Sequence, residues 1–259
     1  MRNDHVVAMQ GRVLFALMMR EMSTRYGRNA GGYVWAVLEP AGTIAIMSAI
    51  FQFIARQPAL GTNFPIFFAT GYLAFHFYLD ISRTVSNAVN SNRALLVLPR
   101  ITVIDTVIAR FFLQLITLSF VSVLIMGGLL IVFDEPVIIR FHHIIISILL
   151  SSFLGLSIGV FNCIAFAYSA TWQSIFMILN RPIFLISGIF FLYESLPRFV
   201  QDILWWNPLI HVTSIMRVGF YPTYEGSFAS PVYVVIFASI PFMIGVMLMR
   251  LMRNTLLEP

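Results

Sequence analysis

Residues 104–133 read IDTVIARFFLQLITLSFVSVLIMGGLLIVF, an apolar run with no charged residue after Arg110. The hydrocarbon core of a bilayer is about 30 Å thick, and about 20 helical residues cross it. A run of this length therefore predicts a transmembrane helix that is tilted or that protrudes from the bilayer. The whole chain is similar in character, because 59% of its residues are hydrophobic and 10% are charged, against about 45–50% and about 25% in soluble domains.

Five further apolar runs of near-spanning length accompany this one, and polar or Pro- and Gly-containing segments separate them. Together they predict six transmembrane helices, at approximately 33–55, 64–81, 104–133, 144–168, 174–193 and 232–251. The sequence thus predicts an all-α polytopic membrane protein. We divide it into an N-terminal segment, residues 1–32, and a six-span transmembrane domain, residues 33–259.

Arginine accumulates on one side of the predicted spans. All 16 basic residues are Arg, and ten of them lie in residues 2–28, in the loop at about 83–103 and at 250–253. Six spans put these three segments on the same side, which the positive-inside rule makes cytoplasmic, together with both termini. The first thirty residues show no cleavable signal pattern. The net charge of +5 is expected of an inner-membrane protein and also suits anionic lipid or an acidic partner.

Residues 7–28 have the pattern of an amphipathic helix, which is suited to the membrane surface. Its apolar residues recur at helical spacing, with arginines and Glu21 between them: Val13, Leu14, Leu17, Met18 and Met22. The segment is predicted to be cytoplasmic and to lie at the membrane interface. An anchor with no further role would have the same pattern.

The segment between the fifth and sixth predicted spans, at about 195–222, predicts two short helices. Asn207-Pro208 divides it, because a residue before Pro avoids the α region. Ser195 can cap the first helix, and Pro208 can open the second. Each helix is too short to span a bilayer, yet the segment includes the apolar residues Trp205 and Trp206. We predict re-entrant half-helices from the outer face, with protein or water covering their backbone; an interfacial hairpin with a tryptophan belt is the alternative.

Motifs of several enzyme classes are absent from the sequence. The chain contains no Lys, so it lacks the phosphate-binding loop of ATPases, and it has no HExxH motif. Its single cysteine, Cys163, can form no internal disulfide. His142 and His143 are adjacent, so on a helix they point in different directions and do not suit one metal ion. We therefore expect no catalytic site, no metal site and no cofactor in this chain.

Acidic residues near the ends of the spans can also be explained without catalysis. Asp80 precedes Arg83 by three residues, and Asp105 precedes Arg110 by five. We interpret both pairs as charge compensation at the cytoplasmic rim. The deeper spans lack the series of carboxylates that a proton-coupled carrier needs, which is evidence against secondary transport.

Several specific strings of residues occur along the chain. They are RE at 20–21, TRYGR at 24–28, GYVWAVLEP at 32–40, PR at 99–100, RP at 181–182 and WNPLIHV at 206–212. Together they resemble the permease subunits of type-2 ABC exporters, most closely the capsular-polysaccharide permeases of the KpsM/BexB kind. The resemblance covers nearly the whole chain. It implies six spans, a cytoplasmic interface helix, a coupling helix in the loop at about 83–103, and re-entrant outer helices.

The resemblance also implies partners and a cargo. Two copies of the chain would enclose a channel, and two copies of a separate ABC ATPase would bind ATP and Mg. The complex would lie in the inner membrane of a Gram-negative bacterium, with a periplasmic co-polymerase and an outer-membrane exporter, and would have no nucleic-acid partner. Its cargo would be capsular polysaccharide, an acidic glycan on a lipid anchor. Alternatives are a permease for another glycolipid, such as O-antigen or teichoic acid, and, more distantly, a membrane-embedded enzyme that modifies lipid or sugar.

Two groups of candidate site residues follow. The first is expected to dock the ATPase and comprises Arg20, Glu21, Arg25, Tyr26, Arg28, Asn90, Asn92, Arg93, Leu95 and Leu96. The second is expected to line the substrate pathway, because aromatic rings stack on the apolar faces of sugars; its aromatic members are Trp35, Phe184, Phe190, Phe191, Tyr193, Trp205 and Trp206. Contact with lipid or with neighbouring helices would equally explain any one of these aromatic residues.

Arg181 is the remaining candidate for the substrate pathway. It lies inside the fifth predicted span, directly before Pro182, where a charged side chain costs about 2.5–3.5 kcal/mol at the bilayer centre. We expect it to pair with phosphate or with acidic sugars of the cargo. Snorkelling of its long side chain to the interface is the alternative.

Overall fold

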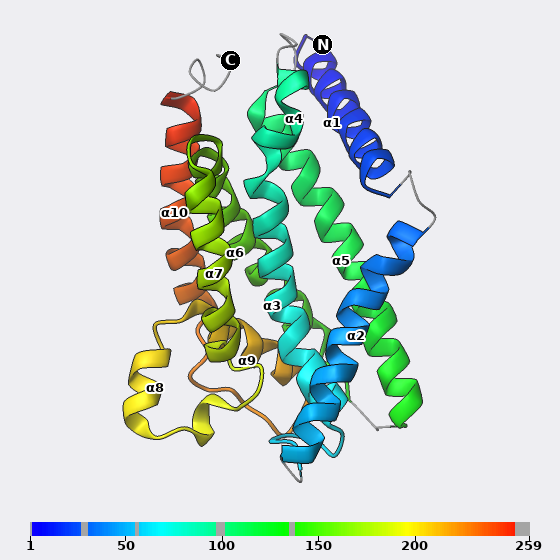
Figure 1. The fold of residues 1–259 in the computed structure, drawn as a ribbon, viewed down its shortest axis with the longest axis vertical. Helices are drawn as coiled ribbons and strands as arrows, with labels where there is room; N and C mark the ends of the chain where they lie inside the picture. Colours follow the sequence, from blue (N-terminus) through cyan, green and yellow to red (C-terminus); the bar gives the residue numbers. More distant parts are fainter. Residues whose placement is uncertain (1, 27–30, 55–56, 97–101, 135–137, 252–259) are drawn as a thin grey trace.

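The computed structural model describes residues 2–26, 31–54, 57–96, 102–134 and 138–251, and within these ranges its regular elements are all helices (Figure 1). In chain order they are α1 (Arg2–Tyr26), α2 (Gly31–Ile54), α3 (Phe64–Ser86), α4 (Ala88–Leu96), α5 (Val103–Phe133), α6 (Phe141–Tyr168), α7 (Ala170–Ile186), a 3-10 turn (Tyr193–Ser195), α8 (Arg198–Leu204), α9 (Pro208–Phe220) and α10 (Pro231–Leu251). The prediction of an all-α protein is confirmed.

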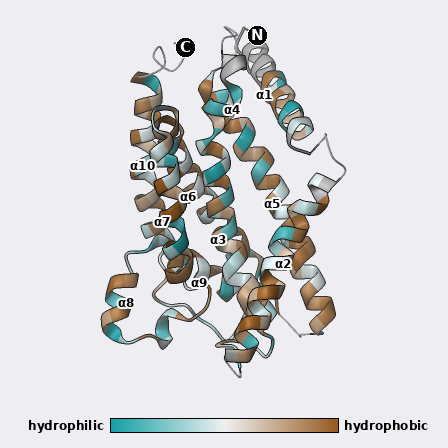
Figure 2. Ribbon diagram, viewed as in Figure 1, coloured by the Kyte–Doolittle hydropathy of each residue, from teal (hydrophilic) through white to brown (hydrophobic). Residues whose placement is uncertain are grey.

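Five of the described helices are long and apolar enough to cross a membrane. They are α2, over Val34–Phe53, and α3, α5, α6 and α10. They coincide with five of the six predicted spans. Large hydrophobic side chains are exposed along α2, α5 and α10, where hydrophobic residues predominate in Figure 2. With 31 residues, α5 is about 47 Å long and therefore longer than the hydrocarbon core.

The fifth predicted span differs most from the structure. Helix α7 has 17 residues and is about 26 Å long. It begins at Ala170, because the Ser169 side chain accepts a hydrogen bond from the Trp172 amide. It ends before Gly188, whose φ of +72° is left-handed. The prediction that this helix continues to Tyr193 is wrong, and a sixth span stays a prediction.

Helix α3 forms the centre of the bundle and contacts α2, α5, α6 and α9. Most of its side chains are buried, including Phe67, Phe75 and Ile81. Its closest partner is α6, because Gly155 has no Cβ. A Cβ there would lie 2.7 Å from the Tyr78 carbonyl oxygen. Small residues allow this kind of close helix packing in membranes.

The segment between α7 and α10 contains the predicted break. The Asn207 side chain accepts a hydrogen bond from the Leu209 amide at 3.1 Å, and Pro208 opens α9. Ser195 lies in the 3-10 turn, and α8 begins only at Arg198, after Pro197. The prediction that Ser195 caps the first helix is therefore wrong, because the chain makes a separate turn there.

Helix α9 is covered by protein, as a re-entrant helix within a membrane must be if water does not cover its backbone. All 13 of its residues are buried, and it packs against α3, α6 and α10. Figure 1 shows α8 and α9 at the end of the bundle opposite to α1 and α4. Protein thus covers the backbone of α9, while its insertion from the outer face stays a prediction.

Helix α1 lies at the other end of the bundle, beside α4 and α5, and the last described turn of α10 is at this end too (Figure 1). Leu17 is buried, whereas Phe15 and Met19 are exposed. An exposed apolar face at the end of a bundle of spans suits the membrane surface, where the sequence predicts this helix to lie.

Candidate functional site

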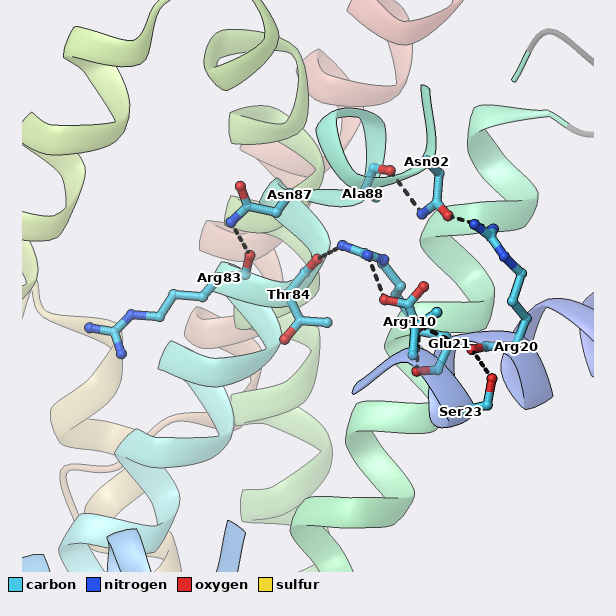
Figure 3. Close-up of polar contacts among 10 residues, drawn as sticks. Arg20, Glu21, Ser23, Arg83, Thr84, Asn87, Ala88, Asn92 and Arg110 are labelled. Atoms are coloured by element: carbon cyan, nitrogen blue, oxygen red, sulfur yellow. Dashed lines mark hydrogen bonds and ion pairs between the residues drawn. The ribbon is translucent and has the colours of Figure 1, made fainter. Parts of the chain in front are cut away.

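An ion pair joins α1 to α5. The Glu21 carboxylate contacts the Arg110 guanidinium, and both side chains are largely buried. Arg110 Nη1 also donates a hydrogen bond to the Thr84 carbonyl of α3 at 3.2 Å. Figure 3 shows Arg110 between these two partners. Removing one partner of a buried pair is costly, because the other charge stays behind. Arg110 therefore links α1, α3 and α5.

Helix α4 is joined to α1 by a second polar contact. Arg20 Nη1 donates to Asn92 Oδ1 at 3.3 Å, and Asn92 Nδ2 donates to the Ala88 carbonyl at 3.1 Å (Figure 3). Asn92 has a non-helical backbone, with φ −119° and ψ 15°, so α4 is kinked there. Asn90 approaches the Phe166 carbonyl of α6 at 3.5 Å. The structure thus brings Arg20, Glu21, Asn90 and Asn92 together at one end of the bundle.

Other members of this predicted group cannot be placed to the same extent. Arg25 and Tyr26 belong to the backbone of α1, and Arg93, Leu95 and Leu96 to that of α4. The structure does not describe the side chains of these five residues. Arg28 lies outside the described residues altogether.

A cavity of about 330 Å³ lies beside the Glu21–Arg110 pair. Its lining includes Ser91, which lies in the loop predicted to dock the ATPase, and Thr84 and Asn87, which sequence reasoning missed. Arg110 was also missed as a member of this site. Its position within an apolar run was the available signal, because an intramembrane charge needs a partner.

The structure uses the two acidic residues of the rim differently from the sequence interpretation. Asp105 caps α5, since its Oδ2 accepts hydrogen bonds from the Thr102 amide and hydroxyl at 2.9 and 2.7 Å. Asp80 Oδ2 lies 3.6 Å from His76 Nδ1. His76 and Asp80 are four residues apart, a spacing that places both side chains on one face of α3.

The aromatic candidates fall into separate groups. The Phe184 and Phe190 rings are 5.3 Å apart, and they pack against Phe75 and Phe68 of α3, respectively. A second cluster contains Phe191, Tyr193 and Trp205, in which the Trp205 ring lies 5.3 Å from that of His211.

Two tryptophans differ from these packed rings because they are exposed, although the Trp206 ring lies 5.5 Å from that of Trp205. Trp35, on α2, and Trp206, between α8 and α9, are 62% and 67% exposed. The aromatic candidates are thus not brought into one row within a single chain. Packing accounts for the position of Phe184 and Phe190, while Trp35 and Trp206 keep exposed ring faces.

Arg181 is exposed on α7. Its neighbour Asn180 is buried and accepts a hydrogen bond from the Tyr78 hydroxyl of α3 at 3.1 Å. Asn180 therefore fixes α7 to α3, and among the residues that the structure describes Arg181 forms no ion pair. Arg181 is free of the packing that holds its neighbour.

Arg217 of α9 is a buried arginine that sequence reasoning missed. It is 1% exposed, and it donates to the carbonyls of Ile189 and Phe191 at 2.8 and 2.9 Å. Its guanidinium lies 4.2 Å from the centre of the Phe67 ring. Burial lowers the pKa of Arg217 to about 10. These bonds explain the end of α7, because carbonyls of the turn after it are paired with Arg217.

His211, also in α9, is held at both ring nitrogens. Nδ1 accepts a hydrogen bond from the Ser230 amide at 3.2 Å, and Nε2 lies 2.8 Å from the Trp205 carbonyl. Because the amide must donate, Nε2 carries the proton of a neutral ring. Burial lowers the pKa of His211. The ring joins the end of α8 to the segment that precedes α10.

Comparison with known proteins gives a consistent result over most of the chain. The family described as ABC-2 type transporter matches residues 12–221. The polysialic acid transport protein KpsM of Escherichia coli is 30% identical over 93% of this chain and 94% of its own length. The capsule polysaccharide export inner-membrane proteins CtrC of Neisseria meningitidis and BexB of Haemophilus influenzae are 27% and 29% identical, over 91% and 83% of this chain and 89% and 81% of their own lengths. The resemblance inferred from the sequence is confirmed.

Proposed function

Since this chain belongs to the ABC-2 type transporter family, we propose that it is the membrane permease subunit of an ATP-driven exporter of capsular polysaccharide. The observation that carries the proposal is the similarity, over most of both chains, to relatives whose names specify polysialic acid transport or capsule polysaccharide export. Five apolar helices of spanning length agree with a permease. Two of these relatives are named inner-membrane proteins, and we assign the chain to the inner membrane of a Gram-negative bacterium.

ATP hydrolysis is assigned to a separate subunit. The chain has no Lys and thus no phosphate-binding loop of the usual kind. We place the docking surface of this ATPase on α1 and α4, at the end of the bundle that carries the Arg20–Asn92 and Glu21–Arg110 contacts. A displacement of α1 or α4 there can reach α5 and α3 directly, because Arg110 contacts both Glu21 and the Thr84 carbonyl. This end, with both termini, would face the cytoplasm.

The functional unit is proposed to be a homodimer. One chain of this size has too little perimeter to surround a glycan, whereas two copies related by a twofold axis can enclose it. Helix α7 supports the proposal, because it exposes a row of apolar side chains that includes Ile178 and Leu185. A purified complex should contain two permeases and two ATPases. A monomeric permease that exports glycan in reconstituted vesicles would contradict the homodimer.

The cargo route is proposed to include Arg181 and the exposed tryptophans. Arg181 can offer a planar, permanently charged fork to a phosphate or to an acidic sugar. Trp35 and Trp206 can stack on sugar rings with their exposed faces. Neither role depends on the packing of the bundle, so both can be tested without unfolding the protein.

The deciding experiment is deletion of the gene followed by identification of the glycan that accumulates in the cytoplasm. We expect lipid-anchored capsular polysaccharide inside the cell, none at the surface, and restoration by the gene on a plasmid. Accumulation of O-antigen or of another glycolipid would assign a different cargo to the same architecture. Unchanged surface glycans would refute export as the function.

A further inference from the structure

Helix α1 has two different apolar faces, and only one of them is used inside the bundle. Four of the five apolar residues that the sequence assigns to the membrane surface are buried or half-buried: Val13, Leu14, Leu17 and Met18. Glu21 shares this face and pairs with Arg110 of α5. The predicted apolar stripe therefore packs mainly against the bundle, and a different set of side chains meets what lies outside it.

The second apolar face of α1 points away from the bundle. It consists of Phe15, Met19 and Met22, which are 66%, 49% and 39% exposed. These residues follow one another by four and three positions, so they form a single stripe along the helix. We call it the outer stripe of α1. A contiguous exposed apolar patch of this kind marks contact with a membrane or with another protein.

Polar side chains of α1 occupy an arc between the two apolar faces. Each residue turns about 100° around a helix, which places Arg12, Arg20 and Ser23 together on this arc, and all three are exposed. Arg20 reaches α4, where it donates to Asn92 at 3.3 Å (Figure 3). The polar arc thus carries the docking surface proposed for the ATPase. The outer stripe lies on another side and is left for another partner.

The neighbouring helix indicates that this partner is lipid. Helix α1 is attached to α5 at Arg110, and Phe112 and Ile116 of α5 are 48% and 59% exposed. Because α5 has the length and composition of a membrane span, hydrocarbon surrounds these side chains. Helix α1 is therefore attached near the boundary between hydrocarbon and water, where an amphipathic helix buries its apolar side about 5–10 Å deep.

The charges on this part of α1 indicate which kind of lipid it meets. Residues 11–24 contain the arginines Arg12 and Arg20 and one acidic residue, Glu21, which Arg110 neutralises. Arg12 lies beside the outer stripe, three residues before Phe15, and it forms no ion pair within the part of the chain that the structure describes. A long arginine side chain can extend along the interface, and its guanidinium can donate two parallel hydrogen bonds to a phosphate.

We propose that α1 binds anionic phospholipid at the bilayer surface through the outer stripe and Arg12. Phe15, Met19 and Met22 enter the acyl region, and Arg12 binds a lipid phosphate beside them. An anionic lipid is preferred to a zwitterionic one, because the zwitterionic headgroup offsets its phosphate with its own cation. One arginine near the surface favours anionic lipid about fivefold, the equivalent of about 1 kcal/mol.

Fluorescence quenching in nanodiscs tests this proposal on the full-length permease. A small fluorophore is attached to Met19→Cys, and the native Cys163 is buried. The nanodiscs contain equal parts of phosphatidylglycerol and phosphatidylcholine, and the acyl chains of one or the other lipid carry bromine, which quenches at short range. We expect both brominated lipids to quench, with phosphatidylglycerol enriched about fivefold beside the label.

Matched variants separate the apolar contact from the charged one. Arg12→Gln should reduce the enrichment to the bulk ratio while both lipids still quench, because the outer stripe remains inserted. Phe15→Glu should weaken quenching by both lipids. A label at Ser23→Cys, on the polar arc, should be quenched little by either. Arg198→Gln, at an exposed arginine of α8 at the other end of the bundle, is the control and should keep the enrichment.

Three outcomes would overturn the proposal. They are no quenching at residue 19 by either lipid, which would leave the outer stripe to a protein partner, equal quenching by the two lipids in the wild type, and an unchanged enrichment in Arg12→Gln. Each variant must elute from size exclusion as the wild type does. The measurement needs neither the ATPase nor a cargo, so its result is independent of the proposed function.

Discussion

Two buried arginines lie at opposite ends of the bundle, and the structure holds them in different ways. Arg110 is 7% exposed and Arg217 is 1% exposed. Arg110 pairs with a carboxylate on another helix, Glu21 of α1. Arg217 instead donates to two backbone carbonyls and lies over the Phe67 ring. At one end of the bundle, helices are thus held together by an ion pair between two side chains. At the other end they are held by hydrogen bonds from a side chain to backbone carbonyls.

The difference bears on which end can move. An ion pair between two side chains can separate and form again without breaking backbone structure. The bonds of Arg217 fix the turn after α7, because the Ile189 and Phe191 carbonyls have this partner in place of helical ones. We infer that the end with α1 and α4 can transmit motion, while the end with α8 and α9 is a rigid frame.

Removing the hydrogen bonds of Arg217 should have the largest effect on the stability of the permease. Arg217→Met keeps the bulk of the side chain and removes both bonds, which leaves two buried carbonyls unpaired. We expect a loss of about 3 kcal/mol in the free energy of unfolding, measured by thermal unfolding of the purified permease in detergent. Arg217→Lys should be intermediate, and Arg198→Gln, at an exposed position of α8, should be neutral. A wild-type melting temperature for Arg217→Met would show that the turn does not need these bonds.

Breaking the Glu21–Arg110 ion pair should lower the stability of the permease less than the loss of Arg217 does, but it should weaken the coupling between the ATPase and the spans more. Glu21→Lys places two cations together, and we expect a loss of about 2 kcal/mol, below the value for a fully buried pair. Membrane insertion should persist, while export and assembly with the ATPase fall. Charge reversal at Arg93 should weaken the same coupling. The exchange Glu21→Arg with Arg110→Glu should recover part of it, which a double-mutant cycle can measure.

The outcome that contradicts this assignment is specific. If export and subunit assembly are unchanged in both the Glu21 and the Arg93 variants, α1 and α4 do not dock the ATPase. The ion pair would then be a structural contact only.

Arg181 extends the comparison to an arginine that is exposed. Arg181→Gln should reduce export about tenfold, the equivalent of about 1.4 kcal/mol, with no change in melting temperature, dimer or ATPase binding. Arg181→Lys should keep part of the export, because it retains the charge without the planar fork. Surface capsule is the readout. Normal capsule at normal expression in the Gln variant would make Arg181 an anchor at the interface.

The spans were predictable because their signal is local. Apolar runs of spanning length give α3, α5, α6 and α10 within a few residues. The end of α7 was not predictable in this way. Residues 183–193 are as apolar as a span, but Ile189 is buried by other helices rather than by lipid. Composition does not distinguish these two apolar surroundings.

The candidate site was predictable where a short string places residues on one helix, and not where partners are distant in sequence. Arg20 and Glu21 were recognised from their motif, and Asn90 and Asn92 from the loop that holds them. Their contacts cross more than sixty positions, as between Arg20 and Asn92. Such pairs form only when α1 packs against α5 beside α4, and α4 packs against α6.

The smallest predicted effect is a pH dependence at the rigid end. Burial lowers the pKa of His211, so the folded protein favours the neutral ring more than the unfolded chain does, where the pKa is about 6.5. The unfolded state then binds more protons as the pH falls, and stability is lost below about pH 6.5. Protonation would also break the bond from the Ser230 amide, because Nδ1 could no longer accept it. We expect the melting temperature to fall between pH 7.5 and about 5.5, and to fall less steeply in His211→Gln, which does not titrate. The exposed His142→Gln variant is the control and should keep the wild-type slope. Equal slopes for wild type and His211→Gln would mean that other groups cause the acid sensitivity of this end.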